Sequence, residues 1–257
     1  MDKLTVLITG ASSGIGLELA KEFAQHGHPV VLLARNTQRL EQIAQEIRTH
    51  FKVRTDVVGA DLRQVNAPSQ IVEELNQRNV TVDILVNNAG FGLLGPFGQL
   101  DLQKQIDMIQ VNISALAHLT RLFLPGMINR DKGGVLNVAS TAAFQAGPNM
   151  AMYYATKAFV LSFTEALHEE VSRTNLHVSC LCPGPTHTGF GAAANMENAK
   201  LFKFGAQSPE EVAKFGYAAY QGNQTIAIPG FKNNFLAIAA KLSPRFLSRR
   251  ISMALHQ

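Results

Sequence analysis

Cysteine is scarce in this chain of 257 residues, and its scarcity excludes two classes of site. Cys180 and Cys182 are too few for a disulfide framework or a cysteine-based metal centre. One residue separates them within an apolar run, so we expect two small core side chains of a strand. The eight histidines form no H-E-x2-H motif or other ligand cluster. We therefore expect no metal site.

Long hydrophobic runs and a targeting segment are also missing. The first residues, MDKLTV, are not a basic stretch followed by an apolar segment and a cleavage site. No stretch reaches the roughly 18 apolar residues of a membrane span. With 46% hydrophobic and 16% charged residues, the chain can bury one large core. These features predict a cytoplasmic protein with a single folded domain.

Acidic residues are absent from residues 231–257, a segment that carries five basic residues: Lys232, Lys241, Arg245, Arg249 and Arg250. Because the whole chain has a net charge of +4, its basic character belongs to this segment, and the first 230 residues are close to neutral. The body of the protein lacks the basic face typical of nucleic-acid-binding proteins. We expect no nucleic-acid partner.

Short apolar runs alternate with stretches of helical periodicity. Continuous apolarity within each run is typical of strands covered on both faces of a parallel sheet. Thr37 is expected to cap the helix that follows it, and Ser208-Pro209-Glu210-Glu211 is a capping box with proline at the first helical position. We predict an α/β fold, a single-domain doubly wound parallel sheet of about seven strands with helices on both faces. The predicted strands are 4–8, 29–34, 53–60, 82–86, 134–140, 177–182 and 225–228.

Three glycines follow the first predicted strand. The stretch LITGASSGIG places Gly10, Gly14 and Gly16 between that strand and an amphipathic helix. Glycine lets backbone N–H groups approach a phosphate closely, and the helix N-terminus adds partial positive charge. The spacing differs from G-x-G-x-x-G. The context predicts a phosphate-binding turn rather than a plain loop.

The glycine spacing, preceded by Thr9, resembles the TG-x3-G-x-G signature of the short-chain dehydrogenase/reductase family. Further family elements follow in order over residues 4–230: the N-N-A-G sequence from Asn87 to Gly90, Asn112, Ser140, Y-x3-K from Tyr153 to Lys157, and P-G-x3-T from Pro183 to Thr188. The resemblance implies a Rossmann-like dinucleotide-binding and catalytic domain over 1–230, with 231–257 as a C-terminal extension. It also implies hydride transfer between a nicotinamide cofactor and a carbonyl or alcohol.

The resemblance implies roles for four catalytic residues. Tyr153 would be the general acid/base, Lys157 would lower its pKa and bind the nicotinamide ribose, Ser140 would orient the carbonyl, and Asn112 would support a proton relay. Side chains four apart share a helix face, and a nearby ammonium favours a phenolate. An isolated Y-x3-K is more often a surface tyrosine beside a solvated lysine, but Ser140 at a strand end argues against that interpretation.

Cofactor preference depends on the end of the second predicted strand. Ala34 stands where an acid would hydrogen-bond the ribose of NAD, and Arg35 follows, able to pair with the 2′-phosphate of NADP. We predict NADP(H) in preference to NAD(H), although Arg35 could instead cap a surface loop. Ser13 stands where many NADP-using relatives have a second basic residue, and Asp61 could be a helix cap. Besides Arg35, the implied cofactor contacts are Gly10, Ser12, Ser13, Gly14, Ile15, Gly16, Asp61, Leu62, Asn88, Ala89, Gly90, Tyr153, Lys157, Pro183, Gly184, Thr186 and Thr188.

Residues 189–207 correspond in the family to a lid over the substrate. We predict a bulky, apolar small-molecule carbonyl or alcohol, since apolar side chains fill the lid and flank the catalytic tyrosine. A non-catalytic NADP-binding regulator or scaffold is the alternative, but it would have no need of Ser140, Tyr153 and Lys157 together. A nucleotide-sugar dehydratase or epimerase would be longer, with a G-x2-G-x2-G turn. The apolar residues are Phe190, Met196, Leu201, Phe202 and Phe204 in the lid, and Met150 and Met152 beside Tyr153.

The segment 231–257 extends beyond the end of compact relatives. Leu247, Ile251 and Leu255 recur every four residues, with arginines on the other faces, as in a basic amphipathic helix. We expect this helix to pack across a subunit interface or over the substrate pocket of a soluble homodimer or homotetramer. Weak peripheral contact with an anionic membrane surface is the alternative.

Overall fold

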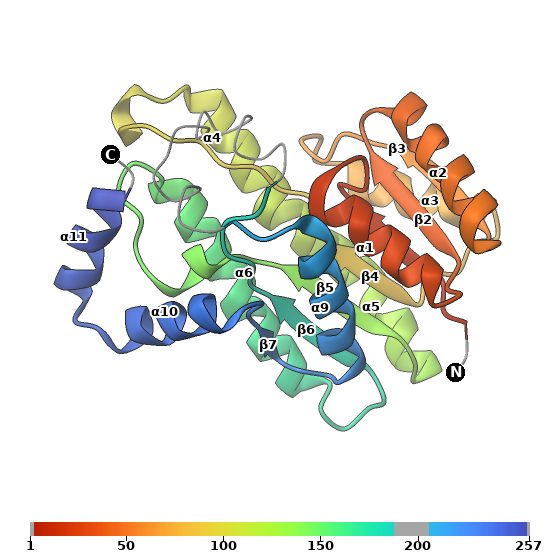
Figure 1. The fold of residues 1–257 in the computed structure, drawn as a ribbon. Helices are drawn as coiled ribbons and strands as arrows, with labels where there is room; N and C mark the ends of the chain where they lie inside the picture. Colours follow the sequence, from red (N-terminus) through yellow and green to blue (C-terminus); the bar gives the residue numbers. More distant parts are fainter. Residues whose placement is uncertain (1–2, 188–205, 256–257) are drawn as a thin grey trace.

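The computed structural model describes residues 3–187 and 206–255 and contains a seven-stranded parallel sheet in the order β3-β2-β1-β4-β5-β6-β7 (Figure 1). Strand order reverses at β1, which pairs with both β2 and β4. The doubly wound α/β fold predicted from the sequence is confirmed. The strands are β1 (Val6–Thr9), β2 (Val30–Ala34), β3 (Thr55–Gly59), β4 (Ile84–Asn87), β5 (Gly134–Val138), β6 (His177–Leu181) and β7 (Ile226–Ala227).

Helices cover both faces of the sheet because successive strand residues point to opposite sides, and both sides are apolar. Ile8 of β1 belongs to the core cluster shared with α1, α2 and α9, whereas its neighbour Leu7 packs with α3, α5 and α6. The helices of the two layers are α1 (Gly14–Gln25), α2 (Thr37–Phe51), α3 (Ala67–Gln77), α4 (Leu102–Ile109), α5 (Leu116–Arg130), α6 (Ala151–Glu170) and α9 (Pro209–Gln221).

Shorter elements and the C-terminal helices complete the described chain. Figure 1 shows α10 and α11 at the end of the molecule away from β3. These elements are η1 (Phe97–Gln99), the π-helical turn η2 (Gln110–Ala115), η3 (Thr141–Phe144), α10 (Phe231–Leu242) and α11 (Arg245–Leu255).

Local signals fix two helix starts. Ser208 accepts from the Glu211 N–H and the Glu211 carboxylate accepts from the Ser208 N–H, so the predicted capping box at α9 is confirmed. The expected cap at Thr37 is wrong, because the Asn36 side chain accepts from the Arg39 N–H at 3.0 Å and caps α2 instead. Thr37 is the first residue of that helix. Asparagine is at least as good an N-cap as threonine, so the helix begins one residue earlier than expected.

The continuous helix over Leu102–Arg130 has the length and hydropathy of a membrane span, with a mean hydropathy of 1.2 over its most apolar window. The prediction that no segment has the length and apolar composition of a membrane span is therefore wrong for this helix. In the structure the helix lies over the sheet, with Ala115, Leu119 and Met127 in the core. Its many leucines and isoleucines raise the mean hydropathy, and some of them, such as Leu119, lie on the face that the helix turns to the core.

Candidate functional site

The glycine turn between β1 and α1 is held by Asn88, which follows β4. The Asn88 amide donates to the carbonyls of Thr9 at 2.9 Å and Gly10 at 3.3 Å. A Cβ on Gly16 would lie 2.3 Å from the Asn88 Nδ2 and 2.4 Å from the Gly10 carbonyl oxygen, so only glycine fits. Gly14 has φ +55°, where side chains are disfavoured. The predicted residue Asn88 therefore braces the turn through its side chain.

The N-terminus of α1 opens from this turn without a side-chain cap. Ser13 is the N-cap residue, its side chain makes no capping hydrogen bond, and the first turn contains no acidic residue. Ser13 is exposed, and Ser12 and Ile15 are half-buried beside it. The free N–H groups and the helix dipole therefore offer an anion site, as the sequence predicts for a phosphate-binding turn.

Thr9 joins the glycine turn to the loop after β4, a role that the sequence analysis missed. Its hydroxyl accepts from the N–H groups of Asn88 at 3.0 Å and Ala89 at 2.9 Å, and donates to the Val86 carbonyl. The position of Thr9 directly before Gly10 in the TG-x3-G-x-G pattern was the available signal. Through Thr9, the predicted residues Asn88, Ala89 and Gly90 lie against the glycine turn.

Ser140 and Tyr153 meet at the carboxyl end of the sheet. Ser140 follows β5 and caps η3, accepting from the Ala142 N–H at 3.1 Å. Tyr153 lies in the first turn of α6 and is buried. Burial raises the pKa of the Tyr153 phenol, and a hydrogen bond with Ser140 partly opposes that rise. The phenol therefore keeps its proton at neutral pH.

Lys157 lies one turn along α6 from Tyr153, as predicted, and is also buried. Its Nζ donates to the Val138 carbonyl at 2.8 Å and lies 5.9 Å from the centroid of the Tyr153 ring. Burial lowers the pKa of Lys157 to about 8. Burial is the largest influence on the Tyr153 phenol, and the Lys157 ammonium is turned to the end of β5, so a lowering of the Tyr153 pKa by Lys157 stays a prediction.

Asn112 lies in the π-helical turn η2, and its side chain is fully hydrogen-bonded. Its Oδ1 accepts from the Phe91 N–H at 3.1 Å, and its Nδ2 donates to the Phe91 carbonyl and the Thr156 hydroxyl, both at 3.0 Å. Thr156, which the sequence analysis did not single out, donates in turn to the Tyr153 carbonyl at 2.7 Å. Its only signal was its place between Tyr153 and Lys157. π-Helical turns are frequent at functional sites.

Arg35 and Asp61 lie at the ends of neighbouring strands, β2 and β3. Arg35 is exposed, and within residues 3–187 and 206–255 no carboxylate lies within ion-pair distance of it. Asp61 caps no helix, since α3 begins at Ala67. Instead, its carboxylate accepts from the Arg63 N–H at 3.1 Å and the Arg63 Nε at 2.9 Å, and Arg63 lowers its pKa.

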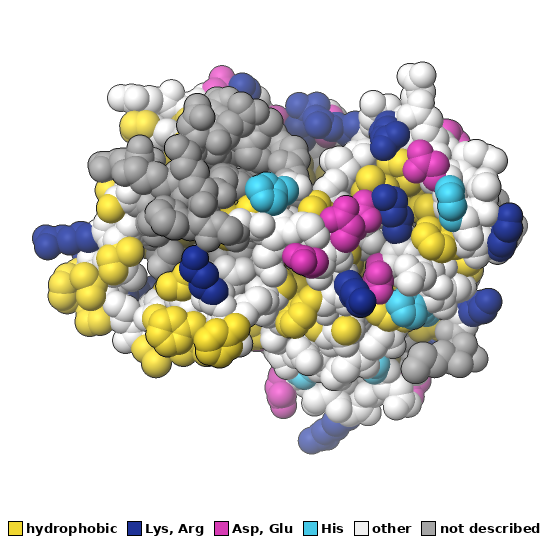
Figure 2. Space-filling model, viewed as in Figure 1, with side chains coloured by type: hydrophobic (Ala, Val, Ile, Leu, Met, Phe, Trp, Pro, Cys, Tyr) yellow, Lys and Arg dark blue, Asp and Glu magenta, His cyan; other side chains and the backbone are white. Residues whose placement is uncertain are grey.

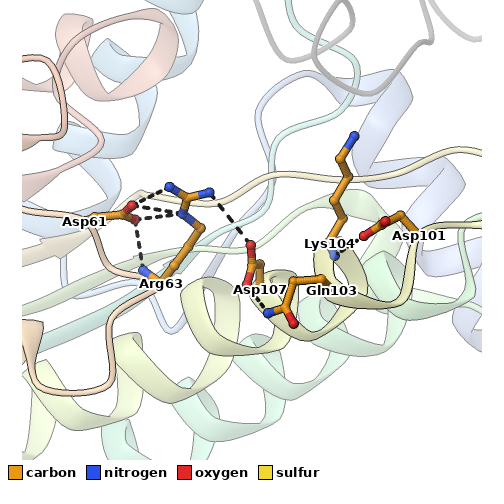
Figure 3. A network of polar contacts seen from close by, with 6 residues as sticks. All are labelled: Asp61, Arg63, Asp101, Gln103, Lys104 and Asp107. Carbon is orange, nitrogen blue, oxygen red and sulfur yellow. Dashed lines mark hydrogen bonds and ion pairs between the residues drawn. The ribbon is translucent and has the colours of Figure 1, made fainter.

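Figure 3 shows that Arg63 also reaches toward Asp107 of α4, with 3.8 Å between the charged groups. The Asp61 carboxylate is thus held in its own loop and the loop is linked to α4. Leu62, the other residue predicted there, is buried.

The P-G-x3-T segment lies after β6. Pro183 accepts from the Thr141 N–H at 2.9 Å, and the Thr186 hydroxyl donates to the Gly184 carbonyl at 3.0 Å. Thr186 also pairs with Gln207. Thr188 lies outside the described residues, as do Phe190, Met196, Leu201, Phe202 and Phe204 of the predicted lid.

Cys180 and Cys182 are buried free cysteines at the end of β6, as predicted. Within residues 3–187 and 206–255, no group of three or more His, Cys, Asp or Glu side chains has the arrangement of a metal site.

These contacts define a Rossmann-like α/β protein in which the glycine turn adjoins the half-buried Ser140 and the buried Tyr153 and Lys157. Residues 4–199 match the model of the family described as short chain dehydrogenase. The chain belongs to the short-chain dehydrogenase/reductase family and is an oxidoreductase of that family.

Three relatives show the extent of the similarity. An uncharacterized oxidoreductase of Staphylococcus epidermidis is 35% identical over 182 residues, 71% of this chain and 77% of that protein. The human very-long-chain 3-oxoacyl-CoA reductase is 35% identical over 181 residues, 69% of this chain and 57% of that protein. The structure of a short-chain dehydrogenase from Sphingobium yanoikuyae in complex with NADPH has a TM-score of 0.83 and 30% identity, and the match covers 91% of this chain and 92% of that chain.

Proposed function

We propose that the protein transfers hydride between NADP(H) and the carbonyl or alcohol carbon of a bulky apolar substrate. The observation that carries the proposal is the convergence of Ser140, Tyr153 and Lys157 beside the loop after β4 and the glycine turn. Ligands of doubly wound sheets bind at the carboxyl ends of the strands, where strand order reverses. The site lies at this end of the sheet.

The residues present fit a dinucleotide. The cradle at Gly16 has no room for a side chain, and the uncapped α1 N-terminus would hold the pyrophosphate. Asp61 and Leu62 would lie at the adenine, and Gly90 and Lys157 at the nicotinamide ribose. Ala89, Pro183, Gly184, Thr186 and Thr188 are proposed to contact the rest of the cofactor. Bound there, the cofactor supplies the hydride that no side chain can store.

Tyr153 is proposed to donate the proton that carbonyl reduction requires. A phenol whose pKa is raised by burial is fully protonated at neutral pH and can give its proton to a developing alkoxide. Ser140 is within reach of the same phenol and would hydrogen-bond the substrate oxygen. Lys157 would offset the negative charge left on Tyr153, because a buried ammonium strongly favours a neighbouring anion.

Asn112 is proposed to act by positioning. Both N–H groups and the oxygen of its amide already have partners in Phe91 and Thr156. Held in this way, the side chain fixes the loop after β4 against the helix that carries Tyr153.

NADP(H) preference is proposed to come from Arg35. Its guanidinium is exposed and has no ion-pair partner in the described chain, so it can pair with a 2′-phosphate without losing another contact. The structure of the Sphingobium relative in complex with NADPH agrees with the use of this cofactor.

The apolar character of the substrate is supported by the surroundings of Tyr153. Met150, Tyr153 and Tyr154 belong to one buried apolar cluster, against which Phe91, Leu93, Leu94 and Met152 pack. Apolar side chains with a few polar groups at the reacting atom are typical of a pocket for an apolar ligand. The name of the human relative, a very-long-chain 3-oxoacyl-CoA reductase, agrees with a carbonyl on an apolar chain.

We further propose that the enzyme is cytoplasmic and a homodimer or homotetramer. Leu122 and Ile128 of α5 and Phe159 of α6 are large exposed side chains on one helical layer. A second copy would cover apolar surface there.

A substrate panel tests the function. Ketones and aldehydes of increasing apolar bulk, with 3-oxoacyl thioesters, are mixed with NADPH or NADH, and turnover is followed at the nicotinamide absorbance. We expect turnover with NADPH that increases with apolar bulk. Tight NADPH binding without turnover on any member would favour a non-catalytic NADP-binding regulator or scaffold.

A further inference from the structure

Helix α11 is packed on the protein with its apolar side facing outward. Ser248 and Ser252 are buried against the body, and the Ser252 hydroxyl lies at the Tyr154 phenol. Leu247 and Ile251, which the sequence predicted to face the body or a subunit, are 43% and 52% exposed. In a helix with one face on the body and the other in water, the apolar residues would face the body and the serines would face the water.

Helix α10 is arranged in the same way. It contacts the body through small or polar residues: Ala237 is buried, and Asn233 donates to the Pro229 carbonyl and the Gln207 side chain, both at 2.9 Å. Its aromatic and aliphatic residues point outward, and Phe231 is 89% exposed. The exposed large hydrophobic residues of the two helices are Phe231, Phe235, Leu236, Ile238, Leu242, Phe246, Leu247, Ile251 and Met253, which we call the tail surface.

Figure 2 shows hydrophobic side chains gathered where Figure 1 places α10 and α11. The surface continues onto α9, because Ile238 lines one groove with Phe215, and Lys241 borders it. Contiguous exposed apolar surface on this scale marks an interaction site.

The charges around the tail surface indicate what kind of partner it binds. All five basic residues of 231–257 are exposed, and the segment has no acidic residue. In residues 3–187 and 206–255, Arg245, Arg249 and Arg250 have no carboxylate within ion-pair distance. An isologous contact between two copies would bring these like charges together. An anionic lipid surface offers negative headgroups for the basic residues and an acyl boundary for the apolar ones.

We propose that α10 and α11 bind reversibly to membranes containing anionic lipids through the tail surface. Both helices also contact residues beside the candidate active site. α11 packs at Tyr154, next to Tyr153, and Asn233 of α10 lies against Gly184. The proposal does not depend on the reaction catalysed.

Flotation of the full-length protein with vesicles tests the proposal. Vesicles contain phosphatidylcholine alone or a mixture with phosphatidylserine, at low and high salt. We expect the protein to float with the mixed vesicles at low salt and to be released at high salt, because headgroup attraction is screened.

Two double variants separate the contributions of apolar contact and of charge to vesicle binding. Phe235→Ser with Ile251→Ser removes apolar contact, and Arg249→Gln with Arg250→Gln removes two charges. Each should lower the bound fraction about tenfold. Val65→Ser with Arg39→Gln, at exposed positions before α3 and on α2, is the matched control and should float like the wild type. Circular dichroism confirms that each variant is folded.

Failure of the wild-type protein to float with any vesicle would overturn the proposal. So would equal flotation of the wild type and both tail variants. If instead the tail variants lower the oligomeric mass while no form binds vesicles, the tail surface is a subunit contact and the proposal is wrong.

Discussion

The Asn112 amide donates to the Thr156 hydroxyl, and that hydroxyl donates to the backbone carbonyl of Tyr153. Since the same amide binds both backbone groups of Phe91, one side chain fixes the loop after β4 relative to the catalytic helix. The two segments that would contact the nicotinamide ribose and the substrate oxygen are thereby held together. Catalysis is sensitive to displacements of about an ångström at such a point.

Thr156→Val should therefore reduce kcat more than it reduces cofactor affinity. The valine keeps the shape but leaves the Asn112 N–H and the Tyr153 carbonyl without their buried partner, which should cost about 1–3 kcal/mol of stability. We expect kcat to fall about tenfold, measured beside urea unfolding. Thr156→Ser, which restores the hydroxyl, should recover most of kcat. Wild-type kcat in the valine variant would contradict the positioning role.

Arg35→Ala should weaken NADPH binding and leave NADH binding nearly unchanged. Loss of a charge-assisted contact with the 2′-phosphate should cost about 1.5–3 kcal/mol, or roughly ten- to hundredfold in Kd. Titration of both cofactors by calorimetry measures the difference. Arg39→Ala, another exposed arginine of the same region, is the control. Equal losses for NADPH and NADH would mean that Arg35 shapes the loop rather than binding the phosphate.

The lowered pKa of Lys157 predicts that the stability of the protein without cofactor depends on pH. Burial lowers the pKa of Lys157 from 10.5 to about 8, so between these values the unfolded chain binds more protons than the native state. The free energy of unfolding should therefore rise with pH in this window. The contribution is on the order of 3 kcal/mol over the whole window.

Urea unfolding of the wild type and Lys157→Met between about pH 8 and pH 10 measures this rise. We expect the wild type to gain stability relative to the variant as pH increases. The window ends near pH 10 because the buried tyrosines Tyr153 and Tyr220, whose pKa values are raised, begin to ionise in the unfolded chain. Parallel curves for the two proteins would show that Lys157 is not a buried ammonium.

Gly16→Ala should damage the phosphate-binding turn. Its Cβ would meet Asn88 Nδ2 and the Gly10 carbonyl at distances that force the turn to move. We expect a loss of about 1–3 kcal/mol in stability and weaker binding of both cofactors. Gly98→Ala is a matched control, since nothing lies within 4 Å of its Cβ position. Unchanged affinity in the Gly16 variant would remove the glycine turn from the cofactor site.

The sequence predicted the sheet well because both faces of each strand are buried, which leaves continuous apolar runs. It also placed Gly10 and Gly16 correctly at a turn that opens a helix, since strand, glycines and helix follow one another locally. Contacts between distant segments were harder to predict. The hydroxyl of Thr9 bonds a loop almost eighty residues away, and no periodicity marks such a bond.

Charge and burial at the site were least predictable. The four-residue spacing puts Tyr153 and Lys157 on one helix face, but the end of β5 determines where the ammonium points. For α11, the apolar period indicated a helix but not which of its faces meets the body. The helix has serines on one face and apolar residues on another, and the body accepts the serines.

The kcat of Tyr153→Phe tests the central claim most directly, because the substitution deletes the transferable proton and little packing. With NADPH and the best ketone of the panel, we predict that kcat falls 10²–10⁴-fold, as expected for loss of a positioned acid, while the Kd for NADPH stays within a few-fold. Tyr154→Phe, on the neighbouring tyrosine whose ring lies 6.1 Å away, should retain kcat within a few-fold. A Tyr153→Phe enzyme that kept more than about a tenth of the wild-type kcat would contradict the assignment of Tyr153 as the proton donor.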